Sequence, residues 1–142
     1  MAFMSTLKKD LNDFSTALRH FHSGLLELTR LEYEIRTKTK PNAFTLFHLV
    51  TQEPSFQWLR PLSGLMATLD EVTDAKAPLG SPQVRDLERA ISELFSPLEP
   101  KYGEFRLEYG RFKSDARVRQ TEKVWREKLL ELRGKYLEGD LN

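Results

Sequence analysis

The 142-residue sequence contains no cysteine, and this absence removes several classes of site at once. Without thiols the chain has no disulfide framework, no thiolate metal site and no cysteine nucleophile. The absence also fits a reducing compartment, so we expect a cytoplasmic protein. A chain of this length buries about two-thirds of its unfolded surface without cross-links or metals. We therefore expect one helical domain over residues 1–142.

Long apolar runs and recognisable catalytic motifs are also lacking. No run approaches the ~20 apolar residues of a membrane span, and the N-terminal stretch lacks the apolar core of a signal peptide. We therefore expect no membrane association. The seven glycines are scattered and form no phosphate-binding loop or dinucleotide fingerprint. Neither a zinc-protease motif nor a nucleophile elbow occurs. We therefore predict that the protein is not an enzyme.

Histidines are few, and their spacing does not suit a metal. The sequence has three histidines: His20, His22 and His48. None has a glutamate three residues before it, as a di-iron helical bundle requires. His20 and His22 lie about 200° apart around a helix, so they do not share a metal site. We predict no metal and no cofactor, and we expect these histidines in the core or at its rim. An axial haem ligand at His48 is the remaining alternative.

Charge is almost balanced, with a formal net charge of +1, but it is unevenly distributed. Acidic residues outnumber basic ones in the middle of the chain, and basic residues outnumber acidic ones at both ends. The last predicted helix is basic along both edges of its apolar face, so nucleic-acid binding must be considered. Its outward positions include Glu127, Glu131 and Glu138, which disfavour contact with a duplex. We therefore expect nucleic acid to be an unlikely partner.

Apolar residues recur at helical spacing along most of the chain and predict an all-α fold. We expect an antiparallel bundle of four to five helices with a proline-kinked central helix. The first helix is predicted from about Ser5 to Lys38 and spans roughly 51 Å. A helix this long needs a long partner, which Asn42–Asp74 supplies after a turn at Lys40–Pro41. The apolar positions of the first helix are Leu7, Leu11, Phe14, Leu18, Phe21, Leu25, Leu28 and Ile35.

Turn and cap residues mark the later elements. We expect Ser81 to cap a third helix that Pro82 opens. Residues 103–112 fit a helix, but Phe105, Leu107 and Tyr109 also alternate as in a strand. We prefer the helix, because no nearby segment offers a pairing strand. Ser114 or Asp115 is expected to cap the last helix, which runs to about Leu137.

The central stretch from Phe44 to Val72 is the most apolar part of the chain. Asn42 is expected to cap a short helix with Phe44, Phe47 and Val50 on one face. Pro54 disfavours helical geometry at Glu53, so we expect a break there and a restart at Pro54. The apolar face then continues through Trp58, Leu62, Leu65, Leu69 and Val72. Pro61 lies within it, so either the helix kinks there or residues 56–60 form a separate turn.

The same stretch carries a resemblance. Residues 56–71 read F-x-W-L-R-P-L-S-x-L-x-x-x-x-D-E, which is similar to a motif in small bacterial helical proteins of unassigned function. The resemblance implies a helical fold and a bacterial origin, and it implies no activity.

Two functions follow from these observations as expectations. The first is a non-catalytic protein-interaction or scaffold module that binds a protein partner or a second copy of itself. The alternative is a helical bundle that encloses a small apolar ligand or cofactor. The binding residues expected for these functions are Trp58, Arg60, Phe47 and His48.

Overall fold

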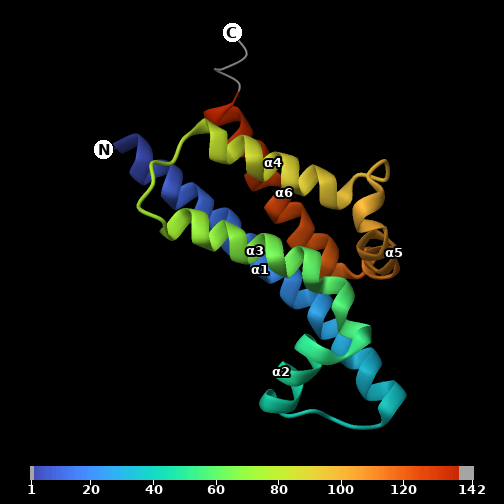
Figure 1. Ribbon diagram of the computed structural model, residues 1–142. Helices are drawn as coiled ribbons and strands as arrows, with labels where there is room; N and C mark the ends of the chain where they lie inside the picture. The colour runs from blue at the N-terminus through green and yellow to red at the C-terminus, as the bar shows by residue number, and fades with distance from the viewer. Residues whose placement is uncertain (1, 138–142) are drawn as a thin grey trace.

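The computed structural model describes residues 2–137, and its regular elements are all helical in this range (Figure 1). Six α-helices occur with two 3₁₀ helices, so the predicted all-α fold is confirmed, with one α-helix more than expected. Residues 103–112 form α5, so the strand alternative for this segment is wrong. The elements are α1 (Ala2–Thr37), α2 (Ala43–Gln52), η1 (Pro54–Leu59), α3 (Arg60–Asp74), α4 (Ser81–Phe95), η2 (Pro100–Tyr102), α5 (Gly103–Phe112) and α6 (Ala116–Tyr136).

The four long helices α1, α3, α4 and α6 lie side by side and form the helical body (Figure 1). Helices α1 and α6 run in opposite directions. The hydroxyl of Tyr136, at the end of α6, contacts Asp10 near the start of α1. Arg117, at the start of α6, reaches Ser23 in the middle of α1 with Nη2 at 3.4 Å from Oγ. The second half of α1 therefore extends past the beginning of α6.

Helices α1 and α3 are also antiparallel, as two polar contacts show. Ser15 Oγ donates a 3.0 Å hydrogen bond to Asp70 Oδ1, and His22 Nε2 lies 3.0 Å from Ser63 Oγ. The predicted antiparallel pairing with the first helix therefore holds for α3. The pairing does not hold for α2, although α2 and α3 both lie in the segment Asn42–Asp74 that was predicted to pair with the first helix. The chain is extended at Glu53, where φ is −74° and ψ is 125°, and this break separates the two helices.

The centre of the helical body is aromatic. Trp125 of α6 is fully buried and lies with its ring centroid 6.3, 5.7 and 5.2 Å from those of Phe14, Phe21 and Phe95. These edge-to-face and tilted contacts join α1, α4 and α6, and aromatic pairs of this kind contribute about 0.5–1.5 kcal/mol each beyond their area burial. Trp125 therefore lies at the centre of the core.

The apolar face of α1 is buried only over its first two-thirds. Leu7, Leu11, Leu18 and Leu25 are at most 1% exposed, whereas Ile35 is 79% exposed. The difference arises because α6 begins opposite the middle of α1. Beyond that point, contacts to α1 come from η1 and α5, as between Tyr33 and Phe56 and between Glu32 and Arg111. Ile35 belongs to the apolar face that the sequence predicts, but it lies outside the core.

Pro61 does not kink the central helix. It is the second residue of α3, a position where its missing N–H removes no helical hydrogen bond. The preceding residues form the separate turn η1, which was the alternative expectation. The backbone N–H of Arg60 donates to the carbonyl of Gln57, so this carbonyl keeps a partner.

Two caps define the starts of α4 and α6. Asp115 caps α6, since its Oδ1 accepts from the backbone N–H groups of Arg117 at 2.9 Å and Val118 at 3.1 Å. The cap of α4 is Gly80 and not Ser81 as expected. The backbone N–H of Gly80 donates to Gln83 Oε1 at 2.7 Å, which fixes the entry of the chain into the helix.

Candidate functional site

Helix α2 is the element that differs most from the rest of the fold. Asn42 caps it, with Oδ1 accepting a 2.9 Å hydrogen bond from Thr45 N. Its ten residues, AFTLFHLVTQ, include no Asp, Glu, Lys or Arg. Figure 1 shows α2 at the lower end of the view, apart from the helical body. Its main packing partner is η1.

Apolar side chains occupy both faces of α2, but only one face is covered. Leu49 is buried, with Leu46 and Val50 partly buried beside it. On the outward face Phe44 is 88% exposed and Phe47 is 72% exposed. The face predicted from Phe44, Phe47 and Val50 is not the covered one, because the extended break after α2 turns Leu49, and not the phenylalanines, toward η1. His48 is exposed on the same outward face.

Two side chains from the following segment hold the end of α2. Gln57 Nε2 donates to the carbonyls of Val50 at 3.3 Å and Glu53 at 3.1 Å. Arg60 Nη2 donates to the carbonyl of Thr51 at 3.3 Å. The last carbonyls of a helix have no partner within it, and a cation beside them also interacts favourably with the helix dipole. Arg60, predicted to bind a partner, thus lies where it fixes the position of α2.

The role of Gln57 was not predicted from the sequence. The sequence does contain a signal for this role, because Gln57 follows Glu53 by four residues. A polar side chain at that separation from the end of a helix can reach the carbonyls that have no partner within the helix.

Trp58 lies in the interior and not on the surface. It is 4% exposed, and its ring centroid lies 5.9 Å from that of Phe112, in a stacked arrangement, and 5.7 Å from that of Phe105. It therefore joins η1 to α5. The structure brings Phe47 and His48 together on the outward face of α2 and places Arg60 at the end of that helix, but it separates Trp58 from all three.

One edge of Trp58 reaches a groove of about 630 Å³ between α1, η1 and α5. Charged side chains line much of it. Arg111 bridges Glu32 of α1 and Glu108 of α5, with the latter ion pair at 2.6 Å. The groove also contacts Tyr33 and Ile35, but neither Phe47 nor His48. It could accept a ligand with both polar and apolar parts.

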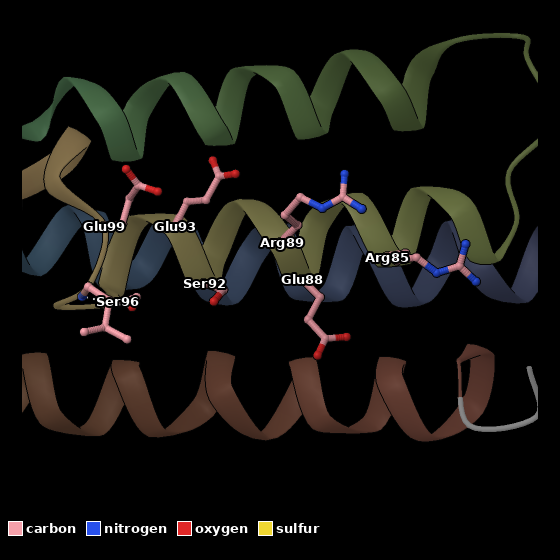
Figure 2. A pocket seen from close by; sticks show the side chains of 8 residues that line it. Arg85, Glu88, Arg89, Ser92, Glu93, Ser96 and Glu99 are labelled. Carbon is pink, nitrogen blue, oxygen red and sulfur yellow. Dashed lines mark hydrogen bonds between the residues drawn. The ribbon is translucent and has the colours of Figure 1, made fainter. Parts of the chain in front are cut away.

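A second groove, of about 480 Å³, follows α4 (Figure 2). Figure 2 shows Glu88 directed toward α6, while Arg89 and Glu93 are directed toward α3. Glu88 lies 3.6 Å from Arg133 Nη1 of α6. Because charges of both signs alternate along it, the groove has no field of one sign, and this pattern is typical of a solvated surface.

The described residues contain no group of three or more His, Asp or Glu side chains placed to hold a metal ion. Within residues 2–137, no helix is long and apolar enough to cross a bilayer. On α6, the outward acidic residues Glu127 and Glu131 are exposed, and Glu138 lies outside the described residues. The predicted absence of a nucleic-acid partner stays a prediction.

The fold places the chain in the class of all-α proteins built from packed helices. Comparison with known proteins found no match, since no family model fits the sequence and no curated protein or solved structure is significantly similar to it.

Proposed function

We propose that the chain is a non-catalytic protein-interaction module whose docking element is the outward face of α2. One observation carries the proposal: α2 is apolar on both faces and uncharged, yet Leu49 is its only buried residue. A helix that is apolar all round is normally buried. Phe44 and Phe47 are therefore apolar side chains that would be more stable in contact with a binding partner than in water.

Burying the exposed phenylalanine side chains of α2 against a partner would contribute substantially to the free energy of binding. Burying a phenylalanine side chain contributes about 1.5–3 kcal/mol relative to leaving it in water. Phe47 is 72% exposed, and Phe44 is more exposed still. Buried aromatic residues are also the commonest anchors of protein interfaces. An amphipathic helix that lays such residues against a partner is a recurring mode of recognition.

The remainder of the chain serves this docking element as a support. In the proposal, the four long helices act as an antiparallel bundle, and Gln57 and Arg60 hold α2 against η1. A binding element already fixed in position loses less conformational entropy when it binds. The absence of cysteine fits a cytoplasmic setting, and the motif at residues 56–71 is consistent with a bacterial source.

A ligand-binding function is the second candidate, and the groove beside Trp58 favours it. In this reading a small molecule would lie over Trp58 and Tyr33. Phe47 and His48 would have no part in it, since neither lines the groove. Native mass spectrometry of the purified protein tests this alternative, because a bound small molecule would add its mass to that of the chain.

Site-specific photo-crosslinking tests the interaction proposal. The change Phe47→p-benzoylphenylalanine places a photoreactive group on the outward face of α2, and the protein is irradiated inside the producing cell. We expect discrete protein adducts. The matched control is the same change at Leu107 of α5, which is 71% exposed and not on α2. Equal adducts at both positions, or none at Phe47, would contradict the proposal.

A further inference from the structure

We propose that the partner of α2 is a second copy of the same chain, with the two α2 helices antiparallel across a two-fold axis. This inference rests on the proposed function, because it assigns the partner of the same face. In this arrangement the outward faces of the two α2 helices meet, and Phe47 and His48 lie near the axis. The start of each α2 lies beside the end of the other.

The lack of charge on α2 favours a second copy. In a two-fold interface the same patch meets itself, so residues near the axis face their own equivalents. A charged residue there would meet a like charge, whereas the sequence AFTLFHLVTQ has no Asp, Glu, Lys or Arg to repel itself. Interfaces between identical subunits are also more apolar than those between different proteins. The net charge of +1 adds little repulsion between copies.

The residues that flank α2 specify the antiparallel direction. Lys40 precedes the helix and Glu53 follows it. Antiparallel pairing brings Lys40 of each copy toward Glu53 of the other, and it also opposes the two helix dipoles favourably. Within residues 2–137, Lys40 forms no ion pair with a carboxylate. Glu53 Oε1 accepts a 3.1 Å hydrogen bond from Ser55 Oγ, and its one ion pair among the described residues is an exposed contact with Arg36 Nη2 at 3.4 Å. A parallel pair would instead place like charges together.

The available area predicts a reversible dimer. Phe44 and Phe47 are 88% and 72% exposed. With roughly 200 Å² for each side chain, the two supply about 300 Å² per copy. A stable interface of standard size buries about 800 Å² per partner. The phenylalanines therefore supply more than a third of that area, and the polar residues of the same face, such as His48, supply part of the remainder.

Sedimentation equilibrium over a wide concentration range tests the pairing. We expect the mass to rise from the 16.6 kDa of one chain toward twice that value. Phe47→Ser removes an apolar contact, and His48→Lys places two like charges near the axis. Each change is expected to weaken dimerisation by about tenfold or more. Leu107→Ser, on the exposed surface of α5, is the matched control and should leave the dimer unchanged. Circular dichroism verifies that every variant is folded.

A charge exchange tests the direction of pairing. Lys40→Glu should weaken the dimer at low salt, and adding Glu53→Lys to the same chain should restore it. Failure of restoration while Phe47→Ser still weakens the dimer would overturn the antiparallel arrangement. A dimer that neither Phe47→Ser nor His48→Lys affects would overturn the use of α2.

The outcomes also separate this inference from the proposed function. A mass of one chain at every concentration, together with adducts of Phe47→p-benzoylphenylalanine to a different protein, would overturn the pairing and leave the interaction module standing. A mass of one chain with no adducts would overturn both. Adducts with the mass of two chains, found together with a concentration-dependent dimer, support both.

Discussion

The hydroxyl of Tyr136 donates a 2.8 Å hydrogen bond to Asp10 Oδ2, which joins two residues 126 positions apart. Lys135 Nζ lies 3.1 Å from the same oxygen. Burial alone would raise the pKa of Asp10, but the hydrogen bonds from Tyr136 and Lys135 outweigh it and hold this pKa below the ordinary 3.8. Burial, together with the hydrogen bond to Asp10, raises the pKa of Tyr136 to about 12. This contact connects the end of α6 to the start of α1.

We expect Tyr136→Phe to lower the free energy of unfolding by about 1.5–3 kcal/mol at neutral pH, because a hydrogen bond to a charged group is lost. The folded pKa of Asp10 is depressed, so its contribution is present above 3.8 and is lost as the pH falls through the lowered value. Urea denaturation at a series of pH values measures both effects. Tyr33→Phe is the control, since the Tyr33 hydroxyl makes no hydrogen bond within residues 2–137. Equal losses for the two variants would contradict the prediction.

His22 makes the stability depend on pH in a range above that of Asp10. Burial lowers the pKa of His22 from the ordinary 6.5, and Nε2 contacts Ser63 Oγ, whose own proton is donated to the Leu59 carbonyl at 3.1 Å. The unfolded chain therefore binds a proton more readily than the folded one. Stability is full above pH 6.5 and falls as the pH drops through the folded pKa of His22. His22→Gln should flatten thermal stability between about pH 8 and pH 5, whereas the exposed His20→Gln should not.

Removal of the side chain that anchors α2 should loosen that helix alone. In Gln57→Leu two hydrogen bonds to α2 and Glu53 are lost, each contributing about 1 kcal/mol. We expect faster amide exchange over residues 43–53 in hydrogen–deuterium exchange mass spectrometry, with the exchange of α1 and α6 unchanged. The exposed Gln120→Leu on α6 provides the comparison. Unchanged exchange in α2 would show that Leu49 and Arg60 hold the helix without Gln57.

Trp58→Ala should act on stability rather than directly on docking. The side chain is 4% exposed and packs on Phe105 and Phe112, so its removal leaves a cavity. We expect a loss of about 3–5 kcal/mol in the free energy of unfolding. Trp58→Phe keeps part of the ring contact and should cost clearly less. Thermal denaturation compares the two, and a loss below 1 kcal/mol for Trp58→Ala would contradict the buried role.

The sequence by itself determined most of the helices, because their signals are local. Leu7, Leu11, Phe14 and Leu18 share one face of a helix whatever surrounds them, and the structure buries that face. The cap of the last helix was predicted as Ser114 or Asp115, and the structure shows Asp115. Pro54 marked the break at Glu53. These features depend on contacts within a few residues, which the spacing in the sequence records directly.

Only the tertiary structure decided which apolar faces are covered. Phe44 and Phe47 have the same spacing as core residues, yet they lie in solvent, while Trp58 lies inside. The spacing of side chains defines a face of a helix but not the partner of that face. Here the partner depends on the extended backbone at Glu53 and on the hydrogen bonds from Gln57 and Arg60, which together direct Leu49 inward and the two phenylalanines outward.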